Sequence, residues 1–258
     1  MPLRNVALVA LIGAALAVLT GLGVWQLQRN DWKQDLVAHS HERTDAPPLD
    51  IADTTGTDAE AMDYRRVTLR GEWLWEDRMF LANRVRSPSR GEEIVAPVRP
   101  EQGGPAVLVN LGWIPDGARD DVVRGLEEGA GLGVPVGLAR DYSSLDGHQI
   151  PSGSWSAMSP HDMADALGYP VTDWVLLVGE ERDAPGSPSE PLPVQGWQRF
   201  TNTTPHVEYA LTWFGIATVL LVAAVARFVV APRRARQRNE ADPQAGLETG
   251  RAEDVPEA

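Results

Sequence analysis

The chain has 258 residues, with 23 basic and 36 acidic side chains, a net charge of −13 and no cysteine. This acidic balance argues against nucleic-acid binding, because neutralising phosphates needs clustered Lys and Arg. The absence of cysteine excludes disulfides, thiolate zinc sites, iron–sulfur clusters and cysteine nucleophiles.

The first predicted element is a membrane span over residues 6–24, which contain no charged side chain. At about 1.5 Å per residue, 19 residues cross a hydrocarbon core. A cleaved signal peptide is the alternative, because Ala15 and Ala17 form a small-x-small pair that a peptidase could use. The apolar run continues for seven residues beyond Ala17 and ends at Trp25, a residue type that favours headgroups, so we expect an uncleaved anchor.

Residues 25–63 follow as a helical extension and a linker. Trp25, Arg29 and Trp32 lie at intervals of four and three, which places them on one helical face. The stretch 44–63 is rich in Asp, Thr and Pro and has few large apolar residues, which predicts a linker or long loop.

Residues 64–201 form the predicted β-rich domain. Apolar and polar side chains alternate over 66–73, as in a strand with one buried face. Further strands are predicted over residues 78–85, 92–98, 106–114, 134–140 and 173–179. Residues 198–201 are expected to form either a last short strand or an approach to the membrane. Short helices are predicted over 120–128 and after Ser159, where Ser159 can cap, Pro160 fits the first position and Gly168 ends the helix.

The second span is predicted over residues 209–230, after a helix cap and interface at 202–208. Five arginines and no acid lie between 227 and 238. Because basic flanks stay in the cytoplasm, we expect residues 1–5 and 231–258 to be cytoplasmic and the β-rich domain to be extracytoplasmic. The tail after Arg238 is expected to be disordered.

The predicted fold class is therefore two transmembrane helices flanking a mainly antiparallel β domain with one or two short helices. No enzyme motif is present: the sequence lacks a Gly-rich phosphate loop, a G-x-S-x-G elbow and an H-E-x-x-H helix. We therefore expect a protein that is not an enzyme.

Two groups of metal-ligand residue types are better explained as structural. His39 and His41 fit a solvated helix face. Met158, His161 and Met163 offer ligands that suit cuprous copper. Met163, however, falls on the apolar side of the predicted helix, so a core position is favoured.

His206 is the strongest candidate ligand, three residues before the second span. Thr204 as N-cap and Pro205 at the first helical position would start a helix there. His206, Tyr209 and Trp213 then share one face, where the imidazole could ligate a haem iron and the rings could pack on the macrocycle. From spacing alone, an interfacial anchor in which these side chains sit at the headgroups is favoured.

Five segments in order resemble the surfeit locus protein 1 family of cytochrome c oxidase assembly factors. They are GLGVWQLQRNDWKQDLV (21–37), YRRVTLRGEW (64–73), VLVNLGWIP (107–115), SPHDMADALGYPV (159–171) and PHVEYALTWFG (205–215). The chain differs from the family pattern at Leu111, where the family usually has Arg, and at Thr204 and Pro205, which replace an Asn before the histidine.

The resemblance implies an inner-membrane protein that binds haem a and assists its insertion into the catalytic subunit of a haem–copper oxidase, without catalytic turnover. The family's haem-ligating histidine maps onto His206, and its second-span aromatics map onto Tyr209 and Trp213. Trp25 and Arg29, with Gln26 between them, match the first-span motif.

Arg29 is a candidate partner for a haem propionate, because guanidinium and carboxylate pair bidentately. Besides membrane lipid, the expected partners are the oxidase catalytic subunit and haem a synthase, with no nucleic acid. The competing hypothesis is a scaffold without haem, which holds an oxidase subunit through its β domain.

Overall fold

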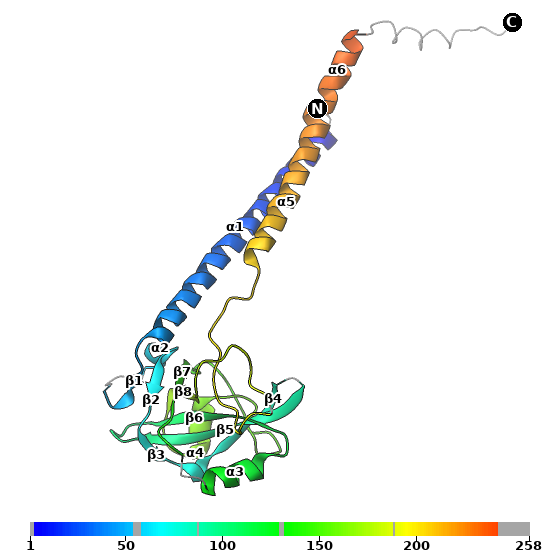
Figure 1. Cartoon of the computed structure of the whole chain (residues 1–258). Coiled ribbons are helices and arrows are strands. Elements are labelled where there is room, and N and C mark those ends of the chain that lie inside the picture. Colours follow the sequence, from blue (N-terminus) through cyan, green and yellow to red (C-terminus); the bar gives the residue numbers. More distant parts are fainter. Residues whose placement is uncertain (1–2, 54–57, 87, 129–131, 188, 242–258) are drawn as a thin grey trace, which may run out of the picture. The chain divides into compact units, whose positions relative to one another are not determined.

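The computed structural model describes residues 3–53, 58–86, 88–128, 132–187 and 189–241 of the chain. These belong to two compact units (Figure 1). The helical unit comprises residues 1–35 and 202–258, and the β domain comprises residues 36–201. The expected disorder of the tail concerns residues that lie almost entirely outside the described ranges.

The helical unit consists of the first part of α1 (Leu3–Asp45) and a second helical stretch. The second stretch comprises α5 (His206–Val225), the π-helical turn η3 (Ala226–Val230) and α6 (Ala231–Ala241). Only 6% of each apolar window is buried within the protein, whereas the core helix of a soluble protein would be mostly buried. The apolar side chains therefore face outward, as expected for helices that cross a membrane.

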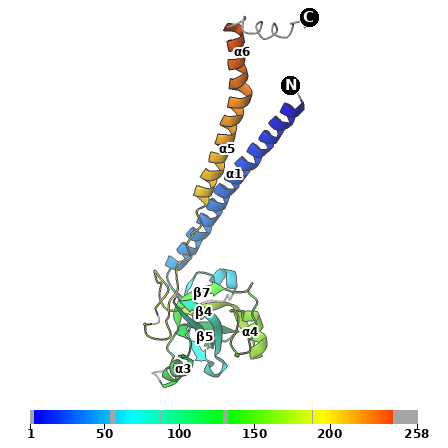
Figure 2. The same cartoon turned by 90° about the vertical axis from the view of Figure 1, so that its right-hand side faces the viewer.

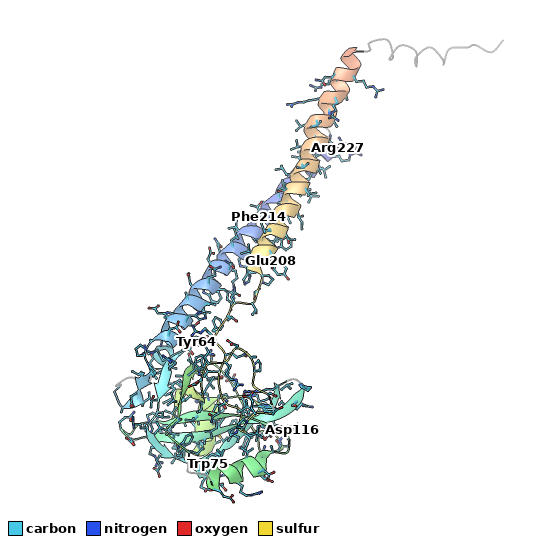
Figure 3. All side chains as sticks on the ribbon, in the orientation of Figure 1. Tyr64, Trp75, Asp116, Glu208, Phe214 and Arg227 are labelled. Atoms are coloured by element: carbon cyan, nitrogen blue, oxygen red, sulfur yellow. The ribbon has the colours of Figure 1, made fainter. Side chains whose placement is uncertain are left out.

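Helices α1 and α5 pack in antiparallel fashion. Gly23 meets Phe214 (labelled in Figure 3), whereas Gln26, further along α1, meets His206, which comes earlier on α5. Figure 2 shows the two helices diverging toward Leu3 and α6. On α5 the buried residues His206, Ala210 and Ala217 recur at intervals of four and seven, which places them on the face toward α1. Small residues on this face allow the backbones to approach.

The β domain is built on one eight-stranded sheet with the order β1-β2-β7-β8-β6-β5-β3, in which β4 pairs with β5. The strands are β1 (Leu49–Asp50), β2 (Arg66–Thr68), β3 (Gly71–Trp73), β4 (Met79–Arg86), β5 (Ser89–Pro100), β6 (Ala106–Pro115), β7 (Val136–Asp141) and β8 (Val171–Val178). Two pairs, β1 with β2 and β6 with β8, are parallel, and the other five are antiparallel. The predicted fold class is thus confirmed.

Strand β6 is the centre of the domain, because every residue from Ala106 to Ile114 is buried. One face of the sheet carries a cluster that includes Val67 and Trp174, and another cluster includes Leu108 and Met163. Gly112 in β6 has a φ of +117°, and a Cβ there would lie 2.5 Å from the carbonyl oxygen of Val194. The loop after β8, which contains Val194, can therefore pack directly on the backbone of β6.

Two helices of the β domain, α3 and α4, lie where the sequence predicts them. Helix α4 (Pro160–Leu167) has Ser159 as its N-cap, which accepts a hydrogen bond from the Asp162 backbone N–H. Gly168 ends it in the left-handed conformation. Helix α3 (Arg119–Glu128) covers the segment predicted over 120–128.

The stretch 44–63 is not the predicted linker. Helix α1 runs to Asp45, and β1, the 3-10 turn η1 (Ile51–Asp53) and helix α2 (Ala59–Met62) follow. Ile51, Ala59 and Met62 are buried in the core cluster that contains Trp174. Isolated apolar residues in a polar stretch give no periodic signal, so this packing depends on contacts with distant strands.

Two strand predictions also differ from the structure. The strand predicted over 66–73 is two strands, because β2 pairs with β7 whereas β3 pairs with β5. Residues 198–201 form no strand; the segment before them makes an isolated bridge between Trp197 and Glu181. Arg199 instead binds the carboxylates of Asp45 and Glu181.

Candidate functional site

His206 begins helix α5 and is buried, with 8% of its surface exposed. The N-cap is Pro205, which has no capping side chain, so the prediction that Thr204 caps the helix is wrong. Proline fixes φ near the helical value and lacks an N–H, so it suits the chain's entry into the helix. The imidazole is therefore presented from the first turn of α5.

The imidazole of His206 contacts an amide on the other helix. Its Nδ1 lies 2.9 Å from Oε1 of Gln26. A carbonyl oxygen can only accept a hydrogen bond, so Nδ1 carries the hydrogen and donates it. In the neutral ring, Nε2 then holds the lone pair.

Nε2 of His206 is buried and has no hydrogen-bond partner among the described residues. A buried polar atom without a partner costs free energy unless something compensates for it. An imidazole nitrogen with a free lone pair, whose other nitrogen donates to a fixed acceptor, is the arrangement that metal-binding histidines adopt. The donor set of His206 therefore fits a role as a ligand of a haem iron, which Nε2 could bind through its lone pair.

The predicted aromatic partners lie differently around this histidine. Tyr209 is 52% exposed, whereas Trp213 is half-buried. The fully buried neighbour on the helix face of His206 is Ala210. The structure therefore leaves about half of Tyr209 exposed to the surroundings of the helix pair.

Arg29 and Trp25 lie on the exposed side of α1. The Arg29 guanidinium stacks over the ring of Trp32 at 3.9 Å from its centroid. The N–H groups of a stacked guanidinium point outward in the plane of the group, so a carboxylate can still approach its edge. The structure thus does not bring Arg29 onto His206, but leaves it in a geometry that suits an anion.

Gln26 is the residue that the sequence interpretation missed as a site residue. It was noted only as part of the first-span motif, since its contact with His206 joins positions 180 apart in the chain. The available signal is its position three residues after Gly23, which places both on the same face of α1.

Gly23 lets the two helices approach beside this contact. A Cβ at Gly23 would lie 2.6 Å from Cε1 and Cζ of Phe214, far inside ordinary carbon contact. The phenyl ring therefore occupies the space that any other residue at position 23 would fill.

The other histidines and methionines singled out in the sequence lie apart from His206. Among the described residues, no group of three or more His, Cys, Asp or Glu is placed to hold a metal ion. Nε2 of His41 lies 2.9 Å from the carbonyl oxygen of Phe200. Met163 is buried in an apolar cluster, as predicted, and Met158 lies in the same cluster, whereas His161 is exposed.

Leu111 in β6 stands where the family that the chain resembles usually has Arg, and it is 3% exposed. It packs in the cluster of Ile94, Ala96 and Ile114. A guanidinium there would need an ion-pair partner, because burying an unpaired charge is costly. The apolar residue therefore suits its surroundings in this chain.

Comparisons with known proteins agree on one family. The model of the SURF1 family matches residues 13–218. Surfeit locus protein 1 of Mus musculus is 26% identical over 235 residues, which cover 83% of this chain and 73% of the mouse protein. SURF1-like proteins of Caenorhabditis elegans (26% identical, 80% of this chain, 69% of that protein) and Rickettsia bellii (25%, 80%, 84%) are also similar.

Proposed function

Because the chain belongs to the SURF1 family, whose members are known as cytochrome c oxidase assembly factors, we propose that it binds haem a through His206. In this proposal it assists insertion of the haem into the catalytic subunit of a haem–copper oxidase. It carries out no catalytic turnover, and haem a synthase is the candidate donor of the haem.

One observation carries the haem proposal: the buried Nε2 of His206 has no partner among the described residues, while Nδ1 faces Gln26. When bound, the haem would supply a redox-active iron with an open coordination position for an imidazole. His206 would bind that iron from the start of α5, and Trp213 would cover the ring on the same helix face. Arg29 would hold a propionate near the headgroups.

The orientation in the membrane follows from charge. Helix α6 carries Arg233, Arg234, Arg236 and Arg238 without an acid before Glu240. Basic flanks stay on the cytoplasmic side, so both termini would lie in the cytoplasm and the β domain outside the inner membrane. His206 would then lie at the outer leaflet, where the β domain can meet the oxidase subunit.

Haem content tests this proposal. Wild type, His206→Ala and His161→Ala are purified in detergent from cells that make haem a, and the haem per chain is measured. His161 is an exposed histidine of the β domain, so its variant controls for loss of a histidine. We expect His161→Ala to match wild type and His206→Ala to retain less than about a tenth, as for loss of an axial ligand. Equal haem in all three proteins refutes the proposal.

The scaffold without haem is the second candidate function. A surface hollow of about 740 Å³ in the β domain has four acidic residues in its lining, Glu180, Glu181, Asp183 and Glu190, against one basic residue, Arg182, which pairs with Glu190. An acidic hollow suits a basic segment of a partner subunit. Co-purification of the oxidase subunit with the full chain, combined with no haem in any variant, would favour this function.

A further inference from the structure

We propose that Gln26 is a positioning residue that fixes the tautomer of His206 and directs Nε2 toward the ligand position. This inference rests on the proposed haem function for its purpose, but its physical content concerns only side chains of this chain. Gln26 lies on α1 and His206 on α5, and a single hydrogen bond of 2.9 Å joins them.

The direction of that hydrogen bond decides which nitrogen is available. An imidazole without neighbours favours the hydrogen on Nε2, which would block this nitrogen as a ligand. The Gln26 carbonyl oxygen accepts from Nδ1–H, and this holds the opposite tautomer. Second-shell acceptors of this kind also fix the ring orientation and raise the basicity of the ligating nitrogen.

An amide is well suited to this position. His206 is buried, and Gln26 is half-buried two residues after the apolar run of residues 6–24. A carboxylate would also accept the hydrogen bond, but burying its charge costs far more than burying an amide. Gln26 therefore supplies an acceptor without placing a charge beside the imidazole.

The amide is also held in place by packing. Gly23, three residues earlier on α1, receives the ring of Phe214, and Ala210 is 1% exposed on the α5 face between the two contacts. The two helices are therefore packed together next to the hydrogen bond, on the side toward the apolar run of α1. A second-shell group acts only if its own position is fixed, and this packing provides that condition.

The first test needs no haem. Nitrogen chemical shifts of 15N-histidine are recorded for the haem-free full chain, with the His206 signals assigned by their loss in His206→Ala. We expect wild type to show Nδ1 protonated and Nε2 with a lone pair, and Gln26→Leu to show mainly the Nε2–H form. Gln28→Leu is the matched control, because Gln28 is an exposed residue on the same helix. A tautomer unchanged by Gln26→Leu overturns the inference.

The second test measures the affinity for haem a. We expect Gln26→Leu to weaken it 10- to 100-fold, as loss of a second-shell partner does. Gln26→Met has nearly the length of Gln but no oxygen acceptor, so we expect it to stay as weak as Gln26→Leu, whereas a purely steric role of Gln26 predicts that Met recovers most of the affinity. Equal affinities of Gln26→Leu and wild type overturn the inference and leave the haem proposal intact.

Failure of wild type to bind haem refutes the proposed function instead. In that case the tautomer measurement still decides the role of Gln26, because it uses the protein without haem. The two tests therefore separate failure of the positioning role from failure of the haem site.

Discussion

Replacing Gly23 by leucine should separate helices α1 and α5. A Cβ at this position lies 2.6 Å from Cε1 and Cζ of Phe214, whereas carbon atoms in contact lie about 3.5–4.0 Å apart. The ring must therefore retreat by about 1 Å for the first added atom alone. The end of a phenyl ring can yield that much to alanine, but leucine adds three further carbons in the same space.

The expected cost follows from this overlap. Overpacking of a packed contact costs about 1–3 kcal/mol, which lowers the ratio of paired to separated helices about 5- to 150-fold. A separation of about 1 Å would also stretch the 2.9 Å contact between Gln26 and His206 beyond 3.5 Å, where it is no longer a hydrogen bond. Gly23→Leu should therefore disturb His206 without changing any residue that touches it.

Spin labels measure the separation directly, because the chain has no native cysteine. Labels on Val18→Cys and Val219→Cys occupy exposed positions, each five residues from the contact of Gly23 with Phe214. We expect Gly23→Leu to increase the mean distance between the two labels by about 1 Å or more and to broaden its distribution. Gly21→Leu is the control, since a Cβ there meets nothing within 4 Å. Identical distributions for the two leucine variants would refute the packing argument.

Two further predictions concern the β domain, and both are measured by urea unfolding of the full chain followed by tryptophan fluorescence. Arg119→Met removes the guanidinium whose Nε lies 2.9 Å from Oε2 of Glu92, a carboxylate that is only 19% exposed, and should lower the free energy of unfolding by about 1–3 kcal/mol. Arg124→Met breaks an exposed ion pair with Asp121 and should lower it by less than about 0.5 kcal/mol. Equal losses of unfolding free energy in the two arginine variants would contradict this prediction. The hydrogen bond from the Ser159 hydroxyl holds the pKa of Asp162 below its ordinary value. The ionised Asp162 carboxylate therefore stabilises the fold above about pH 4, and this stabilisation is lost as the pH falls through the pKa of Asp162 in the folded protein. Asp162→Asn should therefore show a smaller loss of stability below pH 4 than wild type, and an unchanged pH dependence would argue against this role.

Local signals explain why much of the fold could be predicted. The nearly continuous apolar run of residues 106–114 identifies β6, and Ser159 with Gly168 marks both ends of α4. The length of the two apolar runs indicates the spans. Each of these signals is contained within a few turns or one strand, so no knowledge of distant residues is needed.

The remaining features depend on contacts between distant parts of the chain. Ile51 and Met62 are single apolar residues in a polar stretch, and only strands beyond residue 66 give them a core. The break between β2 and β3 reflects pairing with two different strands.

The candidate site shows the same division. His206 could be identified from its place before an apolar run, because that signal is local. Its partner Gln26 could not, since residues 180 apart meet only through the packing of Gly23 against Phe214.

The iron–histidine stretching vibration tests the central claim most directly. Resonance Raman spectra of the ferrous haem-loaded protein are compared with and without 15N-histidine, in wild type and His206→Ala. If Nε2 of His206 is the axial ligand, the wild-type band shifts with the isotope and the band is absent from the variant. An isotope-sensitive band of equal strength in His206→Ala would show that another histidine binds the iron and would contradict the account.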